Sequence, residues 1–168
     1  MKLLYVVASL IFAGAVAAQE SATNFAGTYY CKISAMGGLA KTPGTENWQA
    51  TPFNVQDLAY KVIVTDTGET FGTNFSGNYR VYRIKANYFG EPPNKFGCRA
   101  RTQIDPNDGE KIAIPESGHA ECSFFKSDFI LNFKANLIQV MFSGGYMDPE
   151  KKDTDTPFVA VGKCDKIG

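Results

Sequence analysis

Apolar and polar residues alternate in short runs along most of the chain, which is the pattern of β-strands with one buried face. The first run alternates around two tyrosines and a cysteine. Clusters of turn-forming residues separate the later runs, which are rich in aromatic and β-branched residues. Strands are therefore predicted at residues 25–33, 79–85, 97–104, 119–125, 128–133, 137–142 and 158–163, with a hairpin turn at 134–136.

One early segment has a helical rather than a strand-like period. Thr51 can cap a helix, and Pro52 suits its first turn. Four apolar residues follow at the spacing i, i+3, i+4 and i+7: Val55, Leu58, Ala59 and Val62. This stripe predicts one amphipathic helix of about four turns, which residues 65–68 end. The preceding residues 34–50 are rich in glycine, threonine and proline and predict a loop.

A single early helix followed by antiparallel strands predicts an α+β fold. The helix is expected to pack on one face of a twisted antiparallel sheet. The sequence contains no internal repeat, and its charged stretch 148–155 predicts a solvated loop. Residues 19–168 are long enough for a single domain with a hydrophobic core.

The start of the chain has the order of charge and hydrophobicity of a signal peptide spanning residues 1–18. Lys2 supplies an early positive charge, an apolar run follows, and the small residues Val16 and Ala18 precede Gln19. A membrane anchor is the weaker alternative, because the run is slightly short for a bilayer span and no stop-transfer charges follow it. We therefore predict a secreted protein with no membrane span.

Charge is nearly balanced in the predicted mature domain. Lysine plus arginine number 17 and the acidic residues 17, so loss of Lys2 leaves 16 against 17 and a net charge of about −1 (16 − 17). This balance excludes a general electrostatic attraction to nucleic acid or to anionic membranes. We expect no cofactor and no metal.

The four cysteines all lie in the predicted mature domain, and an even number in an exported chain points to two disulfides. Three pairings are possible. We favour Cys31 with Cys164, which would tie the start of the domain to its end, and Cys98 with Cys122, which would join neighbouring strands. A zinc site is the alternative, but no two cysteines have the close spacing of structural zinc sites.

Several local strings resemble a known family. The predicted helix followed by residues 68–74 resembles a ribonuclease helix exit, and residues 128–145 with 158–160 and Cys164 resemble a last hairpin and final strand. The tripeptide at 29–31 is similar to an aromatic-x-Cys start. Together they resemble the small fungal guanyl-preferring ribonucleases and, more closely, the ribonuclease-like secreted effectors of powdery-mildew fungi, over most of the mature chain.

The resemblance implies four catalytic parts that this sequence lacks. Ribonucleases of this kind use a Tyr-Pro-His segment, a glutamate, an arginine and a late histidine to move protons and hold the phosphate. Residues 75–79 and 81–85 contain no histidine, residues 97–101 contain no carboxylate, and residues 128–130 contain no arginine. Ser143 stands where the late histidine is expected. The resemblance therefore implies a ribonuclease-like fold without catalysis.

Cationic and aromatic side chains are concentrated in two predicted strands, where alternation would place several of them on a common face. Such a surface could hold phosphates and stack on bases. In the alternative interpretation the tyrosines are core or edge residues and the arginines their solvated partners. The candidates for binding RNA or a protein partner are Tyr79, Arg80, Tyr82, Arg83, Lys85, Arg99 and Arg101.

Asn74 begins the sequence Asn-Phe-Ser, an acceptor for N-glycosylation in a secreted chain. The acceptor suggests a surface loop. A glycan there would lie beside the region that the resemblance assigns to the old active site, which would argue against a bulky ligand in that groove.

These observations together predict a monomeric secreted effector with an inactive ribonuclease-like fold. Its expected partners are a host protein or RNA, through which it would suppress defence, and a host immune receptor. One alternative is an active secreted endoribonuclease that uses His119, the only histidine, with Glu110, Glu116 or Glu121. The other is an unrelated secreted β-rich domain that binds a ligand or inhibits a partner, which a disulfide between Cys31 and Cys98 would favour.

Overall fold

The computed structural model describes residues 23–168 except 43, 46, 74–76, 93–96 and 144–155. The predicted signal peptide at 1–18, the glycosylation acceptor Asn74 and the charged stretch 148–155 lie outside the described residues. Within the described part of the chain there are ten β-strands and no helix. The strands are β1 (Gly27–Lys41), β2 (Trp48–Pro52), β3 (Ala59–Thr73), β4 (Gly77–Tyr88), β5 (Arg99–Ala100), β6 (Ile112–Ile114), β7 (His119–Phe124), β8 (Ser127–Asn132), β9 (Leu137–Phe142) and β10 (Phe158–Lys166).

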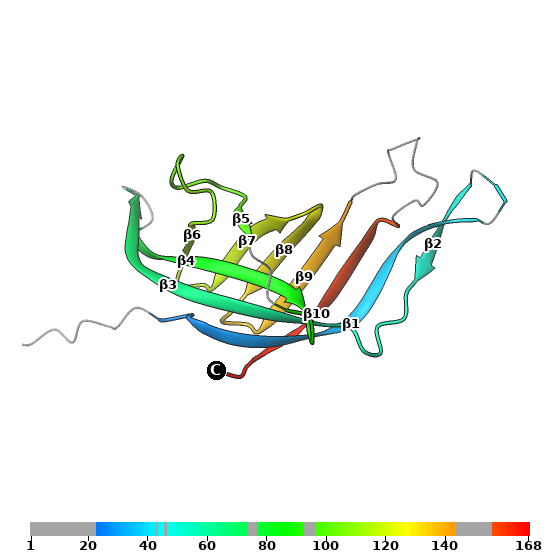
Figure 1. Ribbon diagram of the computed structural model, residues 1–168, viewed down its shortest axis with the longest axis horizontal. Helices are drawn as coiled ribbons and strands as arrows, with labels where there is room; N and C mark the ends of the chain where they lie inside the picture. Colours follow the sequence, from blue (N-terminus) through cyan, green and yellow to red (C-terminus); the bar gives the residue numbers. More distant parts are fainter. Residues whose placement is uncertain (1–22, 43, 46, 74–76, 93–96, 144–155) are drawn as a thin grey trace, which may run out of the picture.

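All ten described strands belong to one antiparallel sheet; nine follow the order β5-β7-β8-β9-β10-β1-β3-β4-β6, and β2 pairs with β1 off this path. Apart from β2 and β5, each strand lies beside the next along the chain, and the last strand, β10, pairs with the first. The strand β6 contacts β7 without joining its ladder, so the sheet curls into a nearly closed barrel (Figure 1). This up-and-down arrangement leaves one open seam, between β6 and β7.

The interior of the barrel is filled by side chains at alternate positions of the strands. The ring of Phe133 packs against Phe25 and Tyr29 with centroid distances of 5.9 and 5.0 Å. The rings of Tyr60 and Phe129 meet edge to face at 5.6 Å. Buried aliphatic side chains fill the space between these rings: Ile33, Val62, Val64, Ile84, Leu131, Ile138 and Val140.

Both favoured cysteine pairings are confirmed. Cys31 and Cys164 face each other in the ladder between β1 and β10 and form a disulfide inside the barrel. Cys98, just before β5, is bonded to Cys122 of β7. Two disulfides are compatible with an exported protein. No helix among the described residues is long and apolar enough to cross a membrane.

The predicted α+β fold is wrong, because the segment assigned to the helix forms β3 and the loop before it. Val62 and Val64 are buried, while Lys61 before them and Ile63 between them are partly exposed, which is a period of two. The helical spacing matched this segment because Val55 and Leu58, which lie in the loop before β3, also pack against the core. The β-branched run 62–65 also favours a strand over a helix.

The segments that flank the supposed helix also differ from the prediction. Residues 34–50 are not a loop, because β1 continues to Lys41 and turns back into β2 to form a hairpin arm that leaves the barrel (Figure 1). Residues 65–68 do not end an element; β3 continues through them, with a bulge in its pairing with β4 between Asp66 and Thr70, where Gly68 has φ of 76°. In the region 97–104 only Arg99–Ala100 is a strand, and β6 was not predicted at all.

The later strands agree with the sequence. The predicted strand 137–142 coincides with β9, and the predictions at 119–125, 128–133 and 158–163 match β7, β8 and most of β10. The turn at 134–136 joins β8 to β9, with Asn136 at φ 57°.

Candidate functional site

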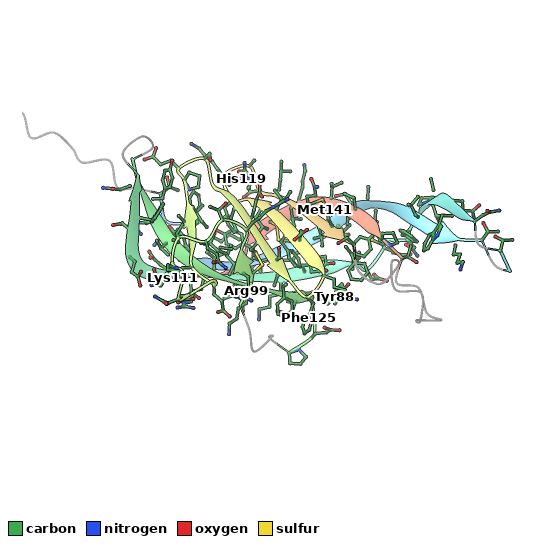
Figure 2. All side chains as sticks on the ribbon, turned by 90° about the horizontal axis from the view of Figure 1, so that it is seen from above. Tyr88, Arg99, Lys111, His119, Phe125 and Met141 are labelled. Carbon is green, nitrogen blue, oxygen red and sulfur yellow. A yellow bond between two sulfur atoms is a disulfide. The ribbon has the colours of Figure 1, made fainter. Side chains whose placement is uncertain are left out.

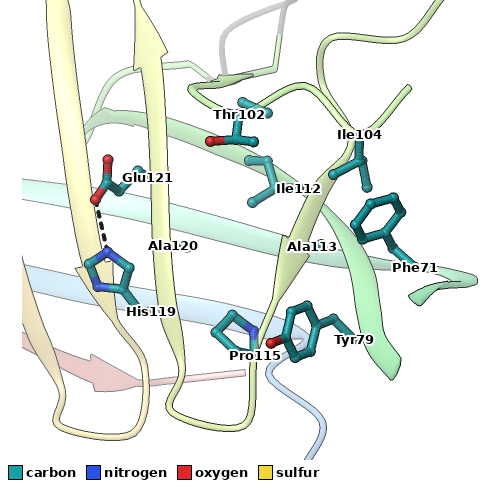
Figure 3. Close-up of a pocket in the computed structure, with 11 residues that line it drawn as sticks. Phe71, Tyr79, Thr102, Ile104, Ile112, Ala113, Pro115, His119, Ala120 and Glu121 are labelled. Carbon is teal, nitrogen blue, oxygen red and sulfur yellow. Dashed lines mark hydrogen bonds and ion pairs between the residues drawn. The ribbon is translucent and has the colours of Figure 1, made fainter. Parts of the chain in front are cut away.

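The open seam of the barrel is the place where a site is formed. On one side β6 pairs with β4, from Arg80–Ile114 to Tyr82–Ile112. On the other side the two-residue strand β5 pairs with β7 through Ala100 and Cys122. The turn 115–118 joins β6 to β7, and the two strands then diverge (Figure 3). A hollow opens between them.

This hollow, which we call the seam groove, has a volume of about 310 Å³. Most of its lining is apolar and comes from β3, β6, β7 and the segment after β5: Phe71, Ile104, Ile112, Ala113, Pro115 and Ala120. Tyr79 of β4 lies across the groove from His119 (Figure 3). Small alanine side chains at positions 113 and 120 keep the floor open, because larger side chains there would fill it.

One edge of the seam groove is polar. His119 and Glu121 are two residues apart on β7, so both side chains point to the outer face. The Nε2 atom of His119 lies 2.9 Å from Oε1 of Glu121, and a guanidinium nitrogen of Arg101 lies 3.3 Å from Oε2 of the same carboxylate. The backbone amide of Arg101 also donates to the Glu121 carbonyl at 3.3 Å. We call these three side chains the His119–Glu121–Arg101 cluster.

The contacts in this cluster stabilise the charged carboxylate. The hydrogen bond with His119 lowers the pKa of Glu121 most, and the positive charge of Arg101 lowers it further. At neutral pH, therefore, the Glu121 charge is matched by that of Arg101. The polar edge offers hydrogen-bonding groups without a surplus of charge.

A groove with apolar walls and one polar edge suits a small, mostly apolar molecule with a single polar group. The hydroxyl of Thr102 also lines the groove, above the polar edge in Figure 3. Hydrogen-bonding groups thus come from β7, from the segment after β5 and, across the groove, from the Tyr79 hydroxyl, around a largely apolar surface.

The structure does not gather the predicted cationic and aromatic residues on one surface. Arg80 contacts Asp66 at 3.0 Å, and Arg83 contacts Asp108 and, at 3.5 Å, Glu110. With Arg101 bound to Glu121, three arginines have carboxylate partners within the described chain. This arrangement agrees with the alternative interpretation, in which the arginines are partners of surface groups.

The other candidates are divided among different regions. Tyr82 is fully buried, and its hydroxyl accepts a hydrogen bond from the Phe25 amide at 3.3 Å, so it is a core residue. Lys85 lies on the outer face of β4, opposite Ile63 of β3. Arg99 lines a second cavity, away from the seam groove. Of these candidates only Tyr79 lines the seam groove, and Arg101 is connected to its edge through Glu121.

Of the three carboxylates considered as partners for the histidine, one is in contact with it. Glu110 accepts a hydrogen bond from the Gly97 amide at 3.0 Å, and Glu116 is exposed in the turn between β6 and β7. Glu121 alone contacts His119. The i, i+2 spacing of His119 and Glu121 in a predicted strand was the available signal for this pair. Nothing in the sequence indicated that Phe71 would line the groove.

The comparisons with known proteins give no further assignment. No protein-family model matches the chain. No curated protein and no solved structure shows a significant match to it. The resemblance to ribonuclease-like effectors therefore stays a prediction, and the functional assignment depends on the geometry of the site.

Proposed function

We propose that this protein is an exported, non-catalytic binding protein that holds a small, largely apolar molecule with one uncharged polar group in the seam groove. The observation that carries the proposal is the apolar groove of about 310 Å³ with the His119–Glu121–Arg101 cluster at its edge. Secretion agrees with the two disulfides and with the predicted signal peptide.

The size of the groove sets the expected affinity. Burial of about 200 Å² of apolar ligand surface would contribute about 5 kcal/mol at about 25 cal/mol per Å². A hydrogen bond to the polar edge adds about 1 kcal/mol. Much of this gain is offset by the translational and rotational freedom that the ligand loses on binding, which costs at least about 4 kcal/mol. The ligand is therefore expected to bind weakly and to exchange rapidly.

The polar edge determines what the ligand carries. A hydroxyl group can donate to the Glu121 carboxylate, or to Nδ1 of His119, which is an acceptor in the neutral ring when Nε2–H donates to Glu121. A carboxylate ligand would instead lie beside Glu121 and meet its negative charge. The groove is therefore expected to prefer a neutral alcohol or phenol over an acid of the same shape.

The test uses a matched pair of probes and a matched pair of variants. In the mature, oxidised protein, 2-naphthol should bind and naphthalene-2-carboxylate should not shift signals from groove residues, as followed by two-dimensional NMR. Ala113→Leu fills the groove and should abolish naphthol binding. Ala50→Leu makes the same change at an exposed position of β2 and should leave binding unchanged. Equal binding by both variants would contradict the proposal.

A catalytic role is the second candidate, favoured by the contact between His119 and Glu121. Such a pair can pass one proton, but cleavage of RNA also needs a second group on the other side of the phosphate. Degradation of RNA by the wild-type protein, lost in His119→Ala, would support this candidate against the binding proposal. RNA left intact but bound, with affinity falling steeply with salt, would instead support the predicted RNA-binding effector.

A further inference from the structure

A second cavity lies on the opposite edge of the molecule from His119, near Arg99 and Phe125 (Figure 2). Its volume is about 550 Å³. Its walls come from β5, from the segment that leads into β6, and from the end of β7 with the turn that follows: Arg99, Asp108, Gly109, Glu110, Phe124 and Phe125. We call it the Arg99 cavity, and it shares no lining residue with the seam groove.

Arg99 differs from the other arginines of the chain, which has four. The other three contact carboxylates, whereas Arg99 has no carboxylate contact within the described residues. Its guanidinium lies over Gly109, where an added Cβ would approach Nε to 3.3 Å. The Ala100 amide donates to the Gly109 carbonyl at 2.7 Å and holds β5 against this segment. The cationic group is thus positioned but not neutralised.

The acidic residues of the Arg99 cavity are already engaged elsewhere. Arg83 forms ion pairs with both Asp108 and Glu110, and Glu110 also accepts from the Gly97 amide. The hydrogen bond from Arg83 lowers the pKa of Asp108, so this carboxylate stays ionised and paired. The two arginines and the two carboxylates sum to zero charge, and Arg99 is the one of the four that makes no direct ion pair among the described residues.

The aromatic wall contains an unusual residue. Phe125 has φ of 46° and is 81% exposed, in the turn between β7 and β8. A left-handed conformation costs a bulky side chain roughly 1–2 kcal/mol, and a glycine there would avoid that cost. The Phe125 ring packs edge to face on Phe124, with centroids 4.6 Å apart. Folding gains little from an exposed ring on a strained backbone, which suggests that the ring serves binding.

We propose that the Arg99 cavity binds a planar aromatic carboxylate, with its ring against Phe124 and Phe125 and its carboxylate on the Arg99 guanidinium. A guanidinium presents paired N–H groups that match the two oxygens of a carboxylate. Aromatic rings add favourable offset or edge-to-face packing. This binding site is independent of the seam groove and requires a negatively charged ligand, whereas the seam groove requires a neutral one.

The experiment is a calorimetric titration of naphthalene-2-carboxylate into the mature, oxidised protein. Arg99→Gln should weaken binding at least tenfold. Lys134→Gln removes a cation from an exposed turn and should leave binding unchanged. Phe125→Gly should also weaken binding at least tenfold, and its melting temperature should rise because the strained residue is relieved. The melting temperature thus separates a loss of the binding wall from a loss of folding.

Two further results would decide against this site. Failure of the wild-type protein to bind the carboxylate at millimolar concentration would overturn the proposal, and so would equal affinity in Arg99→Gln. Loss of carboxylate binding in Ala113→Leu instead would place the anion in the seam groove and overturn both proposals. Naphthol binding lost in Ala113→Leu, with carboxylate binding lost only in Arg99→Gln, is the expected pattern.

Discussion

Two junctions of the barrel are built differently: the one between the first and last strands, β1 and β10, and the one between the consecutive strands β6 and β7. β1 and β10 pair at nine positions, and the Cys31–Cys164 disulfide lies within that ladder. β6 and β7 only contact each other, and β6 has three residues. Closure is therefore concentrated where the first and last strands meet, and the middle of the chain is left partly open.

Both candidate binding sites adjoin the weaker junction. The seam groove lies between β6 and β7, and the Arg99 cavity lies where β5 meets the end of β7. Binding sites commonly occupy the less stable parts of a fold, because their walls must adapt to a ligand. In this molecule the strong junction holds the barrel together while the weak one provides concave surfaces.

The comparison would be tested most strongly by removing each disulfide. Loss of Cys31–Cys164, which spans 133 residues, is expected to lower the free energy of unfolding by about 5 kcal/mol on chain-entropy grounds. Loss of Cys98–Cys122, which spans 24 residues, is expected to lower it by about 3.5 kcal/mol. Urea unfolding of the two paired Cys→Ala variants measures both values. An equal or reversed order would contradict the chain-entropy ranking and show that native contacts around each bridge outweigh loop length.

A smaller effect is expected from truncating one core residue at each junction. Ile33→Ala beside the β1–β10 ladder should lower the free energy of unfolding by about 3–4 kcal/mol, because the space it leaves is enclosed. Ile112→Ala should lower it by only about 2 kcal/mol, since its space would join the seam groove. Urea unfolding measures the loss of unfolding free energy in each variant. A loss in Ile112→Ala as large as that in Ile33→Ala would indicate a closed, rigid seam.

The smallest effect concerns the polar edge of the seam groove. The pKa of Glu121 is lower in the folded state than in the unfolded chain, so its contribution is present above the ordinary carboxyl pKa and is lost as pH falls through the folded value. Because the group is partly exposed, the contribution is a few tenths of a kcal/mol. Melting temperatures between about pH 6 and 3 should fall slightly less in Glu121→Gln than in the wild-type protein. Parallel curves would show that the cluster adds nothing to stability.

The sequence predicted the later strands well and the earlier half poorly, for a physical reason. Residues 128–142 alternate with a period of two on either side of a tight turn, and this pattern admits one structure. Residues 51–65 mix apolar residues of a loop with those of a strand, so two periods fit them. The β-branched run within this segment should have weighed more than the spacing.

The candidate site was accessible from the sequence only in part. His119 and Glu121 fall on one face of a predicted strand, which places them together without any tertiary information. Their contact with Arg101 depends on how β5 meets β7, and no local pattern fixes that register. For the same reason Arg99 and Arg101, predicted to share a surface, are separated: Arg99 lines the Arg99 cavity, and Arg101 contacts Glu121 at the edge of the seam groove.

The hairpin arm formed by the end of β1 and by β2 also carries the chain's one tryptophan, Trp48. The arm extends beyond the barrel in Figure 1, and the core rings are phenylalanines and tyrosines. Intrinsic tryptophan emission would therefore report melting of the arm, whereas far-ultraviolet circular dichroism would report melting of the barrel. The two optical signals should give different transition midpoints on heating.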